Sequence, residues 1–300
     1  MSLASETASS RAPFFIDTHC HLDAAEFDAD RDAVYARAVA AGVTTLIIPA
    51  VSRNNFAAVA ATCERYPGCL PAWGLHPMLL DVHRPAHLAD LRAQIEAQRP
   101  LAIGEIGLDL FVRDLDYATQ EFFYVEQLKI AREHDLPVLL HGRKANDQLL
   151  KHLRKIRVRG GIAHAFNGSP QQADEFIKLG FKLGFGGAFT WPRANNLRRL
   201  AVDLPLDAIV LETDSPDMPP AWIGRGRLCH SQQAACNTGM RQKRPQPGGL
   251  LRIRASAALR GLRMERPFAA PRALHPSRIR SNVCPIYSLT SPKLRLRQLT

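Results

Sequence analysis

The feature that most constrains the fold is a regular alternation, over residues 14–214, of short apolar stretches of strand length with segments of helical length. A stretch such as residues 44–49 (TTLIIP) is continuously apolar and β-branched, which is typical of a parallel strand buried on both faces. Repeated βα units of this spacing predict an α/β protein, and eight of them predict a closed (β/α)8 barrel of the TIM type. An open, doubly wound sheet is the alternative, but polar residues recur at strand ends, and only a barrel gathers those ends around one mouth.

The individual elements follow from the same pattern. The apolar stretches predict a first strand from Phe14 and further strands at residues 44–49, 70–74, 101–105, 136–141, 161–164, 181–184 and 208–214. Helical periodicity predicts helices at residues 28–41, 54–66, 85–98, 117–134, 145–155, 170–179 and 195–201.

Polar side chains capable of binding metal stand at five of these strand ends. The first strand runs into a His-x-His pair, and alternate residues of an extended chain share a face, so Asp17, His19 and His21 are expected to project together. The other strand-end candidates are Glu105, His141, His164 and Asp214. Four imidazoles and two carboxylates are too many for one tetrahedral ion, and they suit two divalent ions that share a bridging carboxylate. A ring of hydrogen-bonded polar residues without metal is the alternative, which the desolvation of four histidines disfavours.

Five motifs resemble the TatD family of metal-dependent deoxyribonucleases, which belongs to the amidohydrolase-like barrel superfamily. They are FIDTHCHLD (15–23), GEIGLD (104–109), LLHGRK (139–144), IAHAFNGS (162–169) and LETDSP (211–216). The resemblance implies that His19, His21, Glu105 and Asp214 hold one metal, and that Glu105, His141 and His164 hold the other. It also implies DNA phosphodiester hydrolysis from a 3′ end, with Mg²⁺ as the working ion, although imidazoles favour Mn²⁺ or Zn²⁺.

Catalytic and supporting roles follow from this arrangement. Asp214 is expected to orient the attacking water or accept its proton, and Glu105 to bridge the ions. By the two-residue alternation of a strand, Asp17 is expected one layer beneath His19 and Glu212 one layer beneath Asp214, where they would orient imidazoles or the metal-bound water. Ordinary polar core residues are the alternative for both.

Candidates for binding the substrate phosphate lie on the rim loops, and they are His76, Arg143, Asn167 and Ser169. Arg143 is the preferred anchor because a planar guanidinium matches phosphate oxygens in pairs. The expected partner is single-stranded DNA or a DNA 3′ end, with no membrane partner. Two other functions stay open: an amidohydrolase or lactonase acting on a small molecule, and an inactive truncated paralogue that binds nucleic acid through a basic tail.

Charge divides the chain near residue 225. Residues 225–300 contain sixteen Lys and Arg but a single acid, Glu265, whereas residues 1–224 carry a net charge of −4 within a total of +11. The tail is either a nucleic-acid-binding extension or out-of-frame translation, and the simultaneous loss of acids, periodicity and family resemblance favours the second. We therefore expect a disordered residue 1–13 segment, a barrel at residues 14–224 whose last helix or helices are lost, and a basic tail of low order at residues 225–300.

Cysteine usage and the lack of a signal bear on the compartment. The six cysteines form no C-x-x-C pair, which predicts a reduced, cytoplasmic setting. No apolar run approaches the length of a membrane span, and residues 1–13 do not have the features of a secretory signal.

Overall fold

The computed structural model describes residues 15–223, and it confirms the predicted barrel of parallel strands. Each strand pairs in parallel with the next one along the chain, so the order in the sheet is the order in the sequence. The strands are β1 (Phe15–Asp17), β2 (Val43–Pro49), β3 (Cys69–Trp73), β4 (Ala102–Asp109), β5 (Val138–Arg143), β6 (Gly161–Ala163), β7 (Phe181–Phe185) and β8 (Ile209–Leu211).

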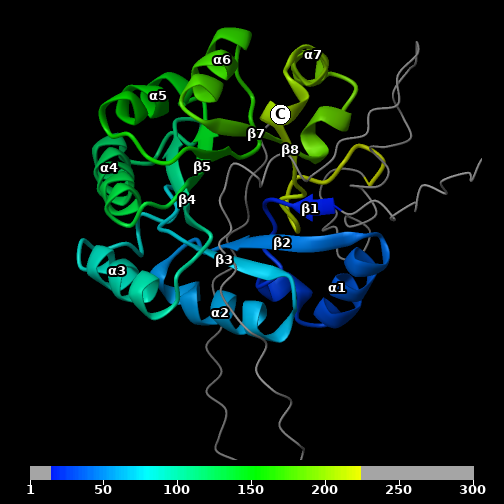
Figure 1. Ribbon diagram of the computed structural model, residues 1–300, viewed down its shortest axis with the longest axis horizontal. Coiled ribbons are helices and arrows are strands. Elements are labelled where there is room, and N and C mark those ends of the chain that lie inside the picture. Colours follow the sequence, from blue (N-terminus) through cyan, green and yellow to red (C-terminus); the bar gives the residue numbers. More distant parts are fainter. Residues whose placement is uncertain (1–14, 224–300) are drawn as a thin grey trace, which may run out of the picture. The chain divides into compact units, whose positions relative to one another are not determined.

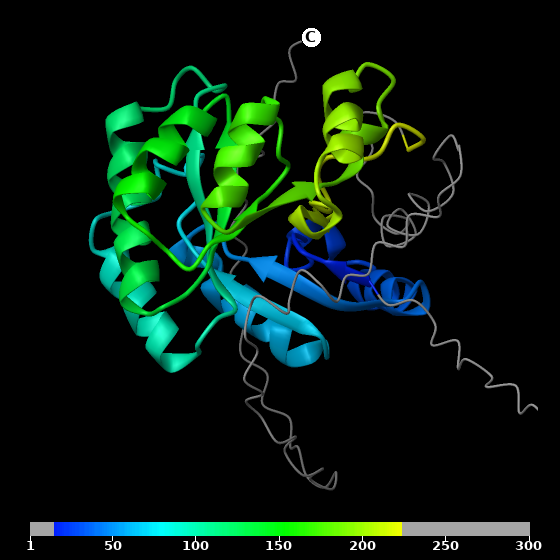
Figure 2. The ribbon, with the colours of Figure 1, turned by 45° about the horizontal axis from the view of Figure 1, so that its top comes forward.

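Helices alternate with these strands and lie around their outside (Figures 1 and 2). They are α1 (Arg31–Ala40), α2 (Phe56–Arg65), α3 (His87–Ala97), α4 (Tyr117–Glu133), α5 (Asn146–Lys155), α6 (Pro170–Lys178) and α7 (Asn195–Asp203). Short 3-10 turns stand at Ala25–Phe27, Arg53–Asn55, Gly187–Thr190 and Leu206–Ala208. All seven predicted helices form, and their ends differ from the prediction by a few residues, as is usual where helix ends fray or begin in a tighter turn.

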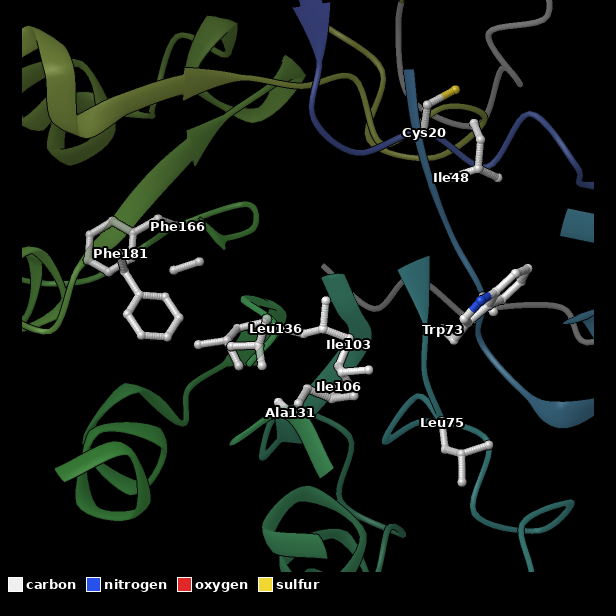
Figure 3. Packing of buried hydrophobic residues seen from close by; sticks show 14 of the residues in the cluster. Cys20, Ile48, Trp73, Leu75, Ile103, Ile106, Ala131, Leu136, Phe166 and Phe181 are labelled. Atoms are coloured by element: carbon white, nitrogen blue, oxygen red, sulfur yellow. The ribbon is translucent and has the colours of Figure 1, made fainter. Parts of the chain in front are cut away.

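The apolar core has an outer and an inner part. The outer part packs between strands and helices; Figure 3 shows Ile103 and Ile106 of β4 near Ala131 of α4 and Leu136. The inner part fills the barrel with aliphatic side chains, namely Ile47, Ala72, Ala102, Leu139, Ile162 and Val210. Because this layer closes the bottom of the barrel, only the mouth at the carboxyl ends of the strands is left for polar side chains.

The barrel closes where β8 meets β1, just beyond the ends of both strands. The Thr18 amide donates to Leu211 O at 3.0 Å and the His21 amide donates to Ser215 O at 2.8 Å. Asp17 joins the same seam, because its carboxylate accepts from the Thr213 hydroxyl at 2.6 Å and the Thr213 amide at 3.0 Å. Closure therefore depends on hydrogen bonds between residues far apart in the sequence.

The prediction that Asp17 lies inside the barrel beneath His19 is wrong. Asp17 pairs with Leu46, which belongs to the outer core, and paired residues of parallel strands face the same side. It lines an outer cavity together with Val34 and Tyr35 of α1. The chain leaves the extended conformation after Asp17, so the two-residue alternation does not carry over to His19. Burial raises the pKa of Asp17 to about 7, against the lowering effect of its hydrogen bonds with Thr213 and the His19 amide.

Several expectations concern parts of the chain outside residues 15–223. The disordered segment at residues 1–13 and the basic tail at residues 225–300, with its lost helices, lie outside the described residues. Within the described part, the chain after β8 forms turns up to residue 223, and no helix there is long and apolar enough to cross a membrane. Cys20, Cys63 and Cys69 are free thiols.

Replacing Thr213 tests the seam. We expect Thr213→Val to lower the free energy of unfolding by about 1–3 kcal/mol, because the buried Asp17 carboxyl loses its hydroxyl partner while the side-chain volume is kept. Thr213→Ser, which retains the hydroxyl, is the matched control. Urea denaturation of the metal-free protein measures both variants, and equal midpoints for the two would contradict this role of Thr213.

Candidate metal centre

Glu105 lies at the centre of the polar residues at the mouth. The prediction placed Glu105 at the end of its strand, but β4 continues to Asp109, so that placement is wrong. The register of β4 against β5 shifts between Ile103 and Ile106, and a bulge of this kind changes the face to which the following side chains point. Ile106 and Leu108 then face the outer core, which leaves Glu105 and Asp109 on the inner face. The strand thus supplies two buried acids to the mouth.

One oxygen of Glu105 faces a first group of donors from β1 and β8. Glu105 Oε2 lies 3.1 Å from His19 Nε2 and 3.8 Å from His21 Nε2. Asp214 Oδ1 lies 3.6 Å from each of these nitrogens, and the two nitrogens are 3.3 Å apart. Asp214 reaches this position with a left-handed φ of 57°, a strained conformation for a residue other than glycine. The structure therefore brings together the four residues predicted to hold one metal.

The other oxygen of Glu105 faces a second group that differs from the prediction. Glu105 Oε1 lies 3.1 Å from His141 Nδ1 and 3.4 Å from His76 Nε2, and these two nitrogens are 3.1 Å apart. His76 was predicted to bind substrate, yet it occupies the place expected for His164. The physical reason is strand order: β3 and β5 flank β4, whereas β6 is one strand further away.

His164 lies on the side of the first group instead. Its ring stacks on His19 with centroids 3.7 Å apart, and its Nε2 is 3.6 Å from Asp214 Oδ2. Glu212, which was predicted one layer beneath Asp214, contacts His164: its Oε1 lies 3.2 Å from His164 Nδ1 and accepts from the Ala165 amide at 2.6 Å. Gly184 makes room for this carboxylate, because a Cβ there would stand 2.1 Å from Glu212 Oε2.

The donor set fits bound metal ions. His19, His21 and Asp214 form one group whose ligand atoms all lie within 4.8 Å of one another, and His76, Glu105 and His141 form another; His19, Glu105 and His164 make a third such combination. Ligands of a tetrahedral ion with bonds of about 2.0–2.1 Å stand about 3.3 Å apart, which is close to the spacings around Glu105. Imidazole nitrogens and carboxylate oxygens turned toward one another at this distance share either a proton or a bound cation.

The pKa shifts indicate which side chains of the centre are charged when no metal is bound. Burial opposes ionisation of Glu105, but His19, His76 and His141 together hold the pKa of this carboxyl well below its usual range. Burial would also lower the pKa of His164, but Glu212 and Asp214 raise it well above its usual value. In the metal-free centre, therefore, the raised pKa of His164 favours a protonated imidazole beside the carboxylates, whereas burial lowers the pKa of His19 and of His76.

Asp109 contacts the second group and was not among the residues predicted for the site. Its Oδ2 lies 3.0 Å from His141 Nε2, and its amide donates to Gln120 Oε1 at 2.7 Å. Burial would raise the pKa of Asp109, but the hydrogen bonds to His141 and to the Val112 amide lower it to about 2. The signal was present in the sequence, because Asp109 stands four residues after Glu105 and so has the same strand parity.

The predicted phosphate-binding residues lie around the rim. Arg143 contacts Asp109 at 3.5 Å through Nη1, and 42% of its side chain is exposed. Asn167 is exposed. Ser169 caps α6 by accepting from the Gln172 amide at 3.1 Å, which leaves its O–H to donate elsewhere.

The chain is a parallel βα barrel in which imidazoles and carboxylates gather at the carboxyl ends of the strands. This combination is typical of metal-dependent hydrolases with a barrel fold. The family model described as TatD related DNase matches residues 16–266, and the chain belongs to this family.

Individual relatives agree with this assignment. The chain is 46% identical over 209 residues to the uncharacterized metal-dependent hydrolase YjjV of Escherichia coli, covering 68% of this chain and 80% of that protein. It is 35% identical over 207 residues to the 3′-5′ ssDNA/RNA exonuclease TatD of Cronobacter sakazakii, covering 68% and 79%. The crystal structure of the E. coli TatD homologue YJJV has a TM-score of 0.75 and 41% identity, covering 82% of this chain and 95% of that one.

Metal affinity should depend on pH. The pKa of His141 is raised, against the effect of burial, by its contacts with Asp109 and Glu105, and the pKa of His164 is raised by Glu212 and Asp214. Binding a cation at either imidazole must displace a proton, so we expect the apparent affinity for Mn²⁺ to rise about tenfold per pH unit for each proton released below the raised pKa. Calorimetry in two buffers of different ionisation enthalpy measures that release, and an affinity that does not change with pH would contradict the expectation.

Replacing Asp109 tests whether its carboxylate orients the His141 ring. We expect Asp109→Asn to weaken Mn²⁺ binding about 10–100-fold, because His141 loses the carboxylate that orients its ring. It should also lower the pKa of His141, which NMR titration of the metal-free protein reports. Asp114→Asn, an exposed acid in the loop after β4, is the matched control and should bind Mn²⁺ as the unaltered protein does. An Asp109→Asn variant with unchanged affinity and unchanged pKa would contradict the assignment.

Proposed function

We propose that this chain is a phosphodiester hydrolase that removes nucleotides from the 3′ end of single-stranded DNA, using two divalent ions that share Glu105. The observation that carries the proposal is the placement of the two Glu105 oxygens, which face separate imidazole groups 3.1 Å away on either side. A deep mouth lined by metal-binding groups admits a strand end more easily than the middle of a duplex. The name of the Cronobacter relative, a 3′-5′ ssDNA/RNA exonuclease, points to the same substrate class.

In this proposal His19, His21, Glu105 and Asp214 hold one ion. Glu105, His141 and His76 hold the second, and His164 with Glu212 supports the first group from below. Bound divalent ions supply activation of water and neutralise charge that develops on the phosphate oxygens. Mg²⁺ is the proposed working ion, and Mn²⁺ or Zn²⁺ binds the same imidazoles with higher intrinsic affinity.

Asp214 is the proposed proton acceptor. Its side chain is 14% exposed whereas that of Glu105 is 3% exposed, so Asp214 is the carboxylate of the first group that water can reach. Burial opposes its ionisation, but His164 and His19 hold its pKa below the usual value, so the group is ionised at neutral pH. Arg143 and Asn167 stand on the rim where a phosphate of the bound strand would pass, which suits them to position it.

Replacing Glu105 separates the proposed reaction from its alternatives. With Mg²⁺ or Mn²⁺, the full-length protein should shorten a 5′-labelled single-stranded oligonucleotide stepwise, and EDTA should stop it. Glu105→Gln should reduce the rate at least about 100-fold, since the amide removes the charge shared by both groups. Glu64→Gln, an exposed acid on α2, is the matched control and should leave the rate unchanged.

Other outcomes would identify other functions. A metal-loaded protein that leaves DNA and RNA intact but hydrolyses a lactone or cyclic amide would be a small-molecule hydrolase on the same barrel. A folded protein that binds no metal would be an inactive paralogue. Both results would overturn the exonuclease proposal.

A further inference from the structure

Phe111 exposes an aromatic ring beside the candidate metal centre. It stands in the loop that follows β4, and 48% of the residue is exposed to solvent. Large apolar side chains do occur singly on protein surfaces, and exposure alone assigns no role. The surroundings of this ring distinguish it from the other exposed apolar residues among residues 15–223.

The ring is held at a fixed place relative to the second imidazole group. Asp109 Oδ1 accepts from the Phe111 amide at 2.9 Å and from the Val112 amide at 3.0 Å. The other oxygen of the same carboxylate lies 3.0 Å from His141 Nε2. One buried acid therefore connects the backbone that carries Phe111 with a candidate metal ligand.

Two cations flank the same ring. The Arg143 guanidinium carbon stands 4.2 Å from the Phe111 ring centroid, and the Lys144 ammonium nitrogen stands 5.2 Å from it. Arg143 is the last residue of β5, two residues after His141, and Lys144 follows it. Lys144 has a left-handed φ of 53°, so the chain turns sharply at this point. An aromatic face with two adjacent cations is the combination that binds a base and its phosphate in single-stranded nucleic acid.

We propose that Phe111, Arg143 and Lys144 form a nucleotide subsite next to the cleavage position. A base of the strand stacks on the exposed Phe111 ring, and Arg143 and Lys144 beside it interact with the neighbouring phosphodiesters. The inference rests on the proposed exonuclease function and adds a substrate contact to it. Every base can stack on an aromatic ring, so this subsite binds the strand without selecting a sequence.

The first experiment compares two exposed phenylalanines. Phe111→Ala should raise KM for a single-stranded oligonucleotide about tenfold, since base stacking of this kind contributes a factor of that order or more. Phe111→Trp should retain the low KM. Phe122→Ala removes a ring of similar exposure, 43%, from α4 and is the matched control. Thermal unfolding verifies that the variants are folded.

Abasic oligonucleotides show whether the lost contact is with a base. A single abasic nucleotide is placed in turn at each of the last four positions from the 3′ end. At one position the KM values of the unaltered protein and Phe111→Ala should coincide, because no base is left to stack. If the difference persists at every position, the subsite does not bind a base and the inference is overturned.

The salt dependence of the affinity for single-stranded DNA tests the role of Lys144. Lys144→Ala should reduce the slope of log affinity against log salt by about 0.7, the value for one contact with a single-stranded phosphate. An unchanged slope removes Lys144 from the subsite. Cleavage with equal KM for Phe111→Ala and Phe122→Ala overturns this inference and leaves the exonuclease proposal standing. Absence of DNA binding and cleavage in the unaltered protein overturns both.

Discussion

The mouth of the barrel depends on one buried carboxylate, that of Glu105. An ionised acid removed from water is costly unless charged or polar partners surround it. Its partners come from the ends of β1, β3 and β5, through His19, His76 and His141. The charge of one side chain therefore holds together, at the mouth, histidines that follow β1 and β3 or lie in β5. Divalent ions between these groups would replace the protons that balance the charge in their absence.

Much of the fold could be predicted because local sequence patterns determine its strands and helices. Each strand is a short apolar run, each helix has its own periodicity, and parallel strands place their carboxyl ends on one rim. For this reason His19, His21, His141, His164 and Asp214 could be placed at the mouth from sequence. The errors arise where the backbone departs from regular geometry. The bend after Asp17 and the register shift near Glu105 depend on contacts with distant strands, and no local pattern reports them.

The exchange of His76 for His164 in the second group has a different cause. Both residues follow a strand and both reach the mouth, so their positions along the chain do not distinguish them. Their positions around the barrel do, because β3 is adjacent to β4 whereas β6 is not. The strand order predicted from the sequence already places the residues that follow β3 beside Glu105. Asp109 could have been found in the same way, from strand parity with Glu105.

The two donor groups differ in what they require of the fold. Glu105 and His141 belong to β4 and β5, and His76 follows β3 by three residues, so the second group forms with the pairing of three consecutive strands. The first group joins β1 to β8, and the Asp17–Thr213 hydrogen bond at that seam spans 196 residues of chain. Thr213 directly precedes Asp214, so the hydrogen bond that closes the barrel also positions the Asp214 carboxylate. An ion bound to the first group would therefore stabilise the closed barrel by mass action, whereas an ion bound to the second would stabilise strands that are already paired.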